Sequence, residues 1–167
     1  MHSIVIMGVA GCGKSSLGEA VAQATGLPLV EGDDHHSPAN RDKMARGIAL
    51  TDADRQDWLA TLGAQLQAYP DGVVVTCSAL KHAYRERLRQ AAAGLRFVFL
   101  DIDKADAQAR VSARAAHFFS TSLVDNQFAT LESPVGEPGV LRLDATFSLA
   151  QLQEAVTQWL ATTQESV

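Results

Sequence analysis

Short apolar runs alternate with longer segments of helical periodicity along the whole chain. Several of the runs are apolar at nearly every position, as expected for strands that are covered on both faces. The predicted strands span residues 3–7, 27–33, 72–78, 95–102 and 140–145. The predicted helices between them span residues 14–25, 38–46, 52–68, 82–93, 104–116, 122–131 and 149–163. This alternation predicts an α/β protein in which helix layers cover a parallel sheet.

Capping residues mark the starts of several predicted helices. Ser37 and Pro38 fit the N-cap and the first position of the helix over 38–46. Thr51 can cap the next helix, and Asp54 stands three residues later, where a capping box needs a polar side chain. The last helix opens on "SLAQ", a similar arrangement. Asp54 is therefore either a helix cap or a site residue, and the local pattern fits both.

Composition narrows the kind of protein. A length of 167 residues suits one domain, so residues 1–167 are expected to form a single domain. The formal net charge of -5, without a long run of Lys or Arg, argues against nucleic acid as the main partner. No apolar run is long enough to span a membrane and no signal peptide pattern is present, so a cytoplasmic protein is expected. Monomer and homodimer both stay open.

The stretch "GVAGCGKS" follows the first predicted strand and opens the first predicted helix. It fits the phosphate-binding pattern G-x-x-x-x-G-K-[ST] in the context that this pattern requires. The glycines allow successive backbone N–H groups to face an anion, and the helix N-terminus adds partial positive charge. Lys14 is expected to bridge the β- and γ-phosphates of ATP, and Ser15 to ligate Mg²⁺. The predicted nucleotide-binding residues of this loop are Gly8, Gly11, Cys12, Gly13, Lys14, Ser15 and Ser16.

Acidic residues near the loop raise the question of a metal site. The third predicted strand ends in "TCS" without an aspartate, so Ser15 and Asp33 are the predicted ligands of Mg²⁺. Four possible ligands stand in a row at 33–36, yet the side chains of a strand alternate between its faces. All four are therefore not expected to converge on one ion. Asp33 is expected to face the loop, as a base for an attacking hydroxyl.

Beyond the phosphate loop, three segments resemble the gluconokinases of the P-loop, shikimate-kinase-like type. They are "EGDDHHSPANRDKMARGIALTDADRQDWL" at 31–59, "CSALKHAYRERLR" at 77–89 and residues 110–134. The resemblance implies a three-layer P-loop kinase fold with a five-stranded parallel sheet of order 2-3-1-4-5 and a mobile lid. It also implies transfer of the γ-phosphate of ATP to the 6-hydroxyl of D-gluconate.

Polar side chains in these segments suit a sugar acid, which carries one carboxylate and several hydroxyls. Such a ligand needs cations and side chains that both donate and accept hydrogen bonds. The resemblance implies a substrate site made of Asp33, His36, Asn40, Lys43, Arg55, Ser78, Lys81, Arg85, His117 and Gln127. For Lys43, Arg85 and Arg89, a solvated helix face is the alternative. His117 and Gln127 either meet the sugar or steady the lid.

Arg110 and Arg114 are four residues apart and share one face of a predicted helix. A polar, serine-rich turn follows, which predicts a lid at approximately 114–127 that closes over the phosphates and excludes water. By resemblance, Arg110 contacts adenine or the α/β-phosphates and Arg114 contacts the γ-phosphate. Lys14, Asp33 and Arg114 are then the expected catalytic residues. The alternative is an exposed helix that forms salt bridges.

Two cysteines, Cys12 and Cys77, make no disulfide framework. Cys12 stands inside the phosphate loop beside Lys14 and a helix N-terminus, where thiols become reactive. One hypothesis is therefore that oxidation of Cys12 blocks ATP binding. The alternative is that both cysteines are small residues that fill tight places.

Three functions fit a phosphate loop in such a chain. A gluconate kinase agrees with all of the segments above. A kinase of another small hydroxy acid, such as shikimate, would share the loop and an aspartate on the second strand. Shikimate kinases normally show a Gly-Gly pair near the third strand, where this chain has "TCSALK". A nucleotide-dependent switch would need switch segments or a partner surface, and the sequence indicates neither.

Overall fold

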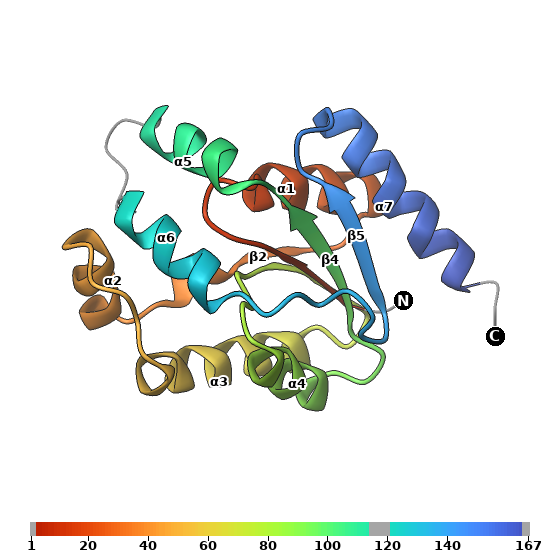
Figure 1. The fold of residues 1–167 in the computed structure, drawn as a ribbon. Helices are drawn as coiled ribbons and strands as arrows, with labels where there is room; N and C mark the ends of the chain where they lie inside the picture. Colours follow the sequence, from red (N-terminus) through yellow and green to blue (C-terminus); the bar gives the residue numbers. More distant parts are fainter. Residues whose placement is uncertain (1–2, 114–120, 165–167) are drawn as a thin grey trace.

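The computed structural model describes residues 3–113 and 121–164. Within these ranges, five strands form one parallel sheet in the order β2-β3-β1-β4-β5 (Figure 1). The strands are β1 (Ile4–Met7), β2 (Leu29–Glu31), β3 (Val74–Thr76), β4 (Arg96–Asp101) and β5 (Val140–Asp144). The parallel α/β fold and the strand order 2-3-1-4-5 that the sequence implies are confirmed.

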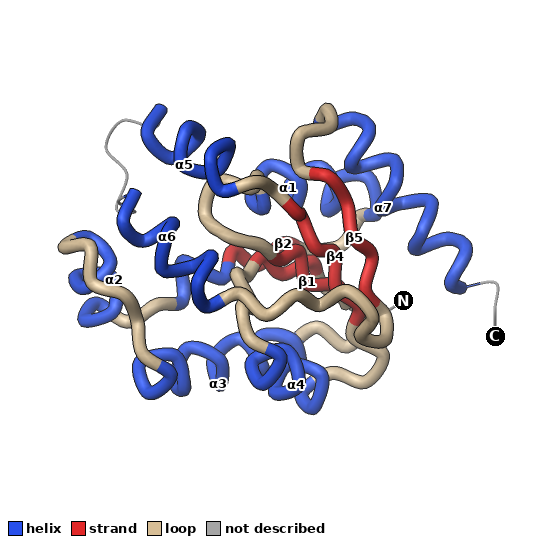
Figure 2. Tube along the Cα trace, viewed as in Figure 1, coloured by secondary structure: helices blue, strands red, loops and turns tan. Residues whose placement is uncertain are grey.

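Helices enclose this sheet, which lies at the centre of the molecule (Figure 2). They are α1 (Lys14–Thr25), the short 3₁₀ helix η1 (Gly32–His35), α2 (Pro38–Ala45), α3 (Asp52–Ala68), α4 (His82–Ala91), α5 (Lys104–Ala113), α6 (Thr121–Thr130) and α7 (Leu149–Gln164). The predicted caps are confirmed: Ser37 caps α2, and Thr51 and Asp54 form a capping box on α3. Ser148 and Gln151 exchange the same hydrogen bonds at the start of α7.

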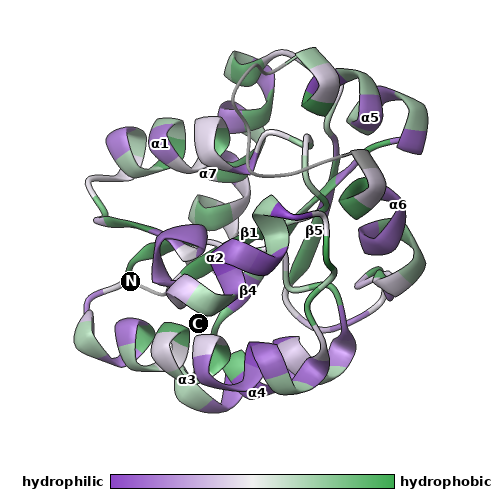
Figure 3. Cartoon of the chain, turned by 90° about the vertical axis from the view of Figure 1, so that its left-hand side faces the viewer, coloured by the Kyte–Doolittle hydropathy of each residue, from purple (hydrophilic) through white to green (hydrophobic). Residues whose placement is uncertain are grey.

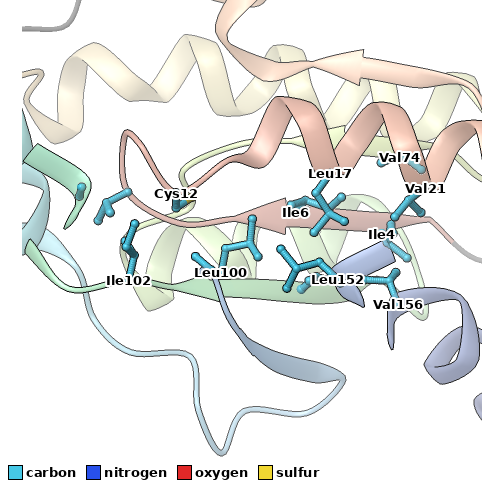
Figure 4. Packing of buried hydrophobic residues seen from close by; sticks show 14 of the residues in the cluster. Ile4, Ile6, Cys12, Leu17, Val21, Val74, Leu100, Ile102, Leu152 and Val156 are labelled. Atoms are coloured by element: carbon cyan, nitrogen blue, oxygen red, sulfur yellow. The ribbon is translucent and has the colours of Figure 1, made fainter. Parts of the chain in front are cut away.

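Alternation along β1 divides the core into two halves. Ile4 and Ile6 face one side of the sheet, where they pack with Leu17 of α1 and Leu152 of α7 (Figure 4). The residues between them face the other side and pack against α3 and α4. All four residues of β1 are fully buried, which explains why the strand is apolar at every position. The sheet is thus a rigid base for whatever lies at its edge.

The end of β2 differs from the prediction. The sequence pattern places a strand through residue 33, but β2 ends at Glu31 and η1 follows directly. Gly32 lies so close to β3 that a Cβ atom there would stand 2.2 Å from Thr76 O, which only glycine permits. The prediction that Asp33 ends a strand was therefore wrong. Asp33 lies in a 3₁₀ turn that directs the chain away from the sheet.

Parallel strands bring their carboxyl ends to one edge of the sheet, where ligands of this fold class bind. The phosphate loop between β1 and α1, the turn η1 after β2, and the turn after β3 all lie at this edge. Over the parts of the chain that the structure describes, no helix combines the length and apolar content that a membrane crossing requires.

Candidate active site

The phosphate loop runs from Gly8 to Ser15 and is held in shape by its own lysine. Lys14 Nζ donates hydrogen bonds to the carbonyls of Gly8 (3.0 Å) and Val9 (3.2 Å). Gly11 adopts a φ of 84°, and a Cβ atom there would stand 2.8 Å from Ala107 O of α5. The loop is therefore curled and packed against α5, with the N-terminus of α1 opening directly behind it. The loop thus has the curled backbone and the adjoining helix N-terminus that the motif predicts.

Arg110 contacts carbonyl groups of the same loop. Its guanidinium donates to the carbonyls of Gly11 (3.2 Å) and Cys12 (3.4 Å), and to Ala145 O (3.0 Å) after β5. Arg110 thus bridges the phosphate loop and the turn that precedes α7. Arg110 does not line the pocket that Lys14 and Ser15 share with Asp33 and Arg55. Its predicted contact with the nucleotide stays a prediction.

A carboxylate that the sequence analysis did not select lies beside Ser15. Ser15 Oγ donates to Glu31 Oε2 at 3.1 Å, and Thr76 Oγ1 donates to the same oxygen at 2.6 Å. Glu31 pairs with Thr76 across β2 and β3, so its side chain is fixed at the sheet edge. Asp33 was predicted as the second metal ligand, but Glu31 is the carboxylate hydrogen-bonded to Ser15. The sequence could have indicated Glu31, because residues two positions apart on a strand face the same side. Glu31 therefore shares the orientation that was expected for Asp33.

The row of acidic and histidine residues at 33–36 does not form a metal cluster. Among the described residues, no three His, Cys, Asp or Glu side chains come together in a way that could hold a metal ion. Asp33 is half exposed, whereas the His36 side chain is almost fully buried. Asp33 and His36 thus differ in exposure, and only part of this row faces solvent.

One pocket joins the phosphate loop to the acceptor side. It is lined by Ala10, Gly11, Gly13, Lys14, Ser15, Ser16, Asp33, His36, Met44, Leu50, Arg55, Trp58, Ser78 and Gln127. Five of the predicted substrate residues thus share a pocket with the phosphate loop: Asp33, His36, Arg55, Ser78 and Gln127. The helix α2, which is mostly hydrophilic (Figure 3), contributes Met44 to the wall.

Three other predicted substrate residues do not line this pocket, because acidic partners hold them elsewhere. Lys43 Nζ contacts both carboxylate oxygens of Asp54 at 2.9 Å, and Asn40 donates to Asp54 O at 2.8 Å. Lys81 Nζ pairs with Asp52 at 3.0 Å. Asp54 therefore caps α3 and also ties α2 to it, while hydrogen bonds from Thr51 and then Lys43 lower the pKa of Asp54 to about 2.

Arg85 requires a correction. It was predicted to bind the substrate, but its side chain is fully buried and forms an ion pair with Glu137 at 2.6 Å. Its remaining N–H groups donate to Ala79 O (2.7 Å) and Glu132 O (2.9 Å). Ala79 has a φ of 47°, a strained value for a residue other than glycine. Arg85 thus supports the turn after β3 that presents Ser78 to the pocket, instead of contacting a ligand itself.

Arg89 also belongs to this support. It forms an ion pair with Glu137 at 3.0 Å and places its guanidinium 4.7 Å from the ring centroid of Phe97. Burial opposes ionisation of Glu137, but hydrogen bonds from Arg85, Arg89 and His82 outweigh it and lower the pKa of Glu137 to about 2. The solvated helix face that was the alternative for these arginines was wrong as well, because both are held in an ion-pair cluster.

His36 is placed in the pocket as a neutral imidazole. Its ring stacks on Trp58 with centroids 4.3 Å apart, and Trp58 Nε1 donates to Gly32 O at 2.8 Å. Burial lowers the pKa of His36 to about 4, against the opposing charge of Asp33. Nδ1 of His36 is buried without a hydrogen-bond partner among the described residues. At neutral pH this side chain can donate one hydrogen bond and accept another.

Gln127 fixes α6 on the phosphate loop. Its Oε1 accepts a hydrogen bond from Ala10 N at 2.6 Å, and its side chain also lines the pocket. Glu132 N, just beyond α6, donates to Leu80 O at 2.8 Å. This end of the predicted lid is therefore anchored to the sheet edge. Arg114 and His117 lie outside the described residues, so their roles stay predictions.

The two cysteines are both buried in the structure. Cys12 is 1% exposed and packs under the loop, where a Cβ atom on Gly8 would stand 2.7 Å from its sulfur. Burial raises the pKa of Cys77 to about 12, so this thiol stays protonated. These surroundings favour the second reading of the cysteines, as small residues that fill tight places.

Comparison with known proteins gives the chain its relatives. A family model described as "AAA domain" matches residues 4–134. The chain is 42% identical to the gluconokinase of Gluconobacter oxydans (strain 621H) over 144 residues, which covers 84% of this chain and 80% of that protein. It is 37% identical to the thermosensitive gluconokinase of Escherichia coli (strain K12) over 161 residues, or 94% and 86% of the two chains.

Solved structures agree with these relatives. A gluconokinase from Sinorhizobium meliloti 1021 superimposes with a TM-score of 0.90 at 46% identity, covering 98% of this chain and 94% of that one. A shikimate kinase from Aquifex aeolicus reaches a TM-score of 0.61 at only 11% identity, with both chains fully covered. The second likeness shows a shared fold and no more.

Proposed function

The chain belongs to the gluconokinase family, and we propose that it transfers the γ-phosphate of ATP to the 6-hydroxyl of D-gluconate. The products are 6-phospho-D-gluconate and ADP. One observation supports this most directly: a single pocket is lined both by Lys14 and Ser15 of the phosphate loop and by Asp33 and Arg55. Donor and acceptor can therefore meet at the carboxyl edge of one sheet, as phosphoryl transfer between two bound molecules requires.

On the nucleotide side, the loop backbone and the N-terminus of α1 hold the phosphates of ATP. Lys14 exchanges its contacts with Gly8 O and Val9 O for the β- and γ-phosphates, where its charge stabilises the transferring group. Arg110, which already lies on the loop, contacts the nucleotide there. This side of the site is generic and would serve any P-loop kinase.

The oxygen atoms beside the loop fit Mg²⁺. Ser15 Oγ and the Glu31 carboxylate lie 3.1 Å apart, and Mg²⁺ prefers one or two protein oxygens with the rest of its shell from phosphates and water. Ser15 and Glu31 would hold the ion, with Thr76 fixing the carboxylate. The ion would supply positive charge that offsets the charge of the phosphates. Asp33 keeps its predicted role as the base.

On the acceptor side, each lining side chain has a matching group on gluconate. Arg55 binds the carboxylate, because it and Lys14 are the permanent cations among the described lining residues. His36, neutral at physiological pH, and Ser78 bind hydroxyls through one donor and one acceptor each. Asp33 accepts the proton of the 6-hydroxyl as it attacks.

The predicted lid extends this proposal. Arg114 is proposed to contact the γ-phosphate, and His117 is proposed either to meet the sugar or to steady the lid. A cytoplasmic location is also part of the proposal. The chain is proposed to act either as a monomer or as a homodimer.

The experiment is an assay of the purified protein with ATP and Mg²⁺ in the presence of gluconate, of shikimate or of neither. Gluconate-dependent formation of ADP, with 6-phosphogluconate identified by phosphorus NMR, is the expected result. Equal ADP formation with and without any sugar acid would contradict the proposal and favour a nucleotide-hydrolysing switch. A preference for shikimate would reassign the acceptor but keep the phosphate loop chemistry.

A further inference from the structure

Arg55 is the acceptor-side cation of the pocket, and it has a single hydrogen-bond partner among the described residues. That partner is the hydroxyl of Tyr84, which accepts from Arg55 Nη1 at 3.1 Å. The Tyr84 ring lies under the guanidinium, 5.4 Å from its central carbon. No carboxylate of the described chain pairs with Arg55, unlike Lys43, Lys81 and Arg85. The charge of Arg55 is therefore available to a ligand.

The hydroxyl of Tyr84 is itself fixed. It donates a short hydrogen bond to Asp52 Oδ1, and Lys81 Nζ contacts both oxygens of the same carboxylate, at 3.0 and 3.2 Å. The proton of Tyr84 is thus committed to Asp52, and the lone pairs of its oxygen face Arg55. Burial and the bond to Asp52 both raise the pKa of Tyr84, so the phenol stays protonated.

Three of these four side chains come from two neighbouring helices, and the fourth, Lys81, is the N-cap of α4. Asp52 and Arg55 are three residues apart on α3, and Tyr84 lies on α4, which packs beside α3 (Figure 1). Tyr84 is buried and Arg55 reaches from beside it into the pocket. Residues of one helix pair therefore form a chain of contacts that begins at the surface with Lys81 and ends at the pocket with Arg55.

We propose that Tyr84 is a positioning residue, whose hydroxyl, oriented by Asp52, holds the Arg55 guanidinium where it receives the carboxylate of the acceptor. An arginine that binds a carboxylate through two parallel hydrogen bonds must present one edge of a planar group. The hydrogen bond and the ring of Tyr84 fix that plane, which lowers the entropy lost on binding. Tyr84 thereby sets the preference for sugar acids over neutral sugars. This inference rests on the proposed function.

The test replaces Tyr84 by phenylalanine, which removes the hydroxyl and keeps the ring. Kinetics are measured with D-gluconate and with D-gluconamide, a neutral analogue that lacks the carboxylate. The KM for gluconate is expected to rise about tenfold, the size of one hydrogen bond to a charged group, while kcat and the KM for ATP stay unchanged. The kcat/KM for gluconamide should not change. Tyr69→Phe, the same chemical change at the far end of α3, is the matched control.

A double-mutant cycle separates positioning from general damage. In an Arg55→Met background, Tyr84→Phe should have no further effect on the KM for gluconate, because the group that it positions is gone. If Tyr84→Phe folds poorly, Asp52→Asn, at an exposed carboxylate, carries the same test in the same direction. An unchanged KM for gluconate, an equal loss with gluconamide, or an additive effect in the cycle would overturn the inference.

Assays of the wild-type protein distinguish a failure of the positioning role of Tyr84 from a failure of the proposed function. If wild type phosphorylates gluconate and Tyr84→Phe matches it in every constant, the positioning role fails and the function stands. If wild type forms no 6-phosphogluconate, the proposed function fails and the role of Tyr84 fails with it.

Discussion

The two halves of the pocket are built in different ways. The phosphate half consists of consecutive residues, Gly8–Ser15, whose backbone does the binding and whose Lys14 closes the loop on itself. The acceptor half takes single side chains from η1, α2, α3, the turn after β3 and α6. A site made of contiguous backbone is specified by a short motif, whereas a site made of scattered side chains depends on which of them are left free by their neighbours.

Ion pairs within the chain decide which side chains of the acceptor half can bind a ligand. Of the cations expected to bind the substrate, Lys43, Lys81 and Arg85 are all paired with carboxylates of the chain itself. Arg55 alone among these four is held by a neutral hydroxyl. Most cations expected on the acceptor side are therefore already paired within the chain, and Arg55 is left to bind a ligand. Substitutions in the phosphate half, at the paired cations and in the acceptor half test this difference.

The largest expected effect is on the phosphate half. Lys14→Ala should lower kcat about 10³-fold, because a preformed cation at the transferring phosphate is lost. Gluconate binding should survive, since Arg55 and His36 are untouched, and Trp58 in the pocket wall allows it to be followed by fluorescence. Loss of gluconate binding together with kcat would show that the two halves do not act separately.

The next effect tests whether Arg85 stabilises the fold or binds gluconate. Arg85→Met should lower the free energy of unfolding by about 3 kcal/mol, because it leaves Glu137 partly unpaired and frees the strained turn at Ala79. The folded variant should keep the wild-type KM for gluconate. Urea unfolding and kinetics on the same sample check both points. Arg87→Met, on the same helix, should have little effect. Wild-type stability with a raised KM would restore Arg85 as a ligand.

A smaller effect tests the chemistry of the acceptor half. Asp33→Asn should lower kcat about 10²-fold, with the KM for ATP unchanged, because proton removal from the attacking hydroxyl is lost. Asp34→Asn is the matched control, since Asp34 is exposed and does not line the pocket. Near-normal turnover of Asp33→Asn would show that Asp33 is not the base.

The last effect is gradual, because it is spread over a range of pH, and it comes from His36. Its pKa is about 4 in the folded chain because of burial, and near 6.5 when unfolded, so the unfolded chain binds more protons between these values. Stability should therefore fall as pH is lowered from 6.5 to 4, by up to about 1.4 kcal/mol per pH unit for this one group. Urea unfolding across this range should show a shallower dependence of stability on pH for His36→Gln than for the wild type. An identical slope in His36→Gln would contradict a buried neutral imidazole.

The sequence by itself determined the features that depend on local pattern. Short apolar runs and helical spacing gave the order of strands and helices. The caps at Ser37 and Thr51 were identified correctly, because each needs only residues three positions apart. The phosphate loop followed from its motif and flanking elements. The family resemblance predicted the strand order and gluconate as the phosphate acceptor, neither of which follows from periodicity alone.

Tertiary structure decided which polar side chains bind and which support. The sequence alone does not distinguish the roles of Arg85 and Arg55. Arg85 is buried in an ion pair with Glu137, fifty-two residues away, whereas Arg55 is held by the hydroxyl of Tyr84 and faces the pocket. Glu31 replaced Asp33 beside Ser15 because Gly32 ends the strand against β3. The physical reason is the same in each case. The interaction between two charged side chains depends on the distance between them in space, and this distance is set only when the helices pack on the sheet.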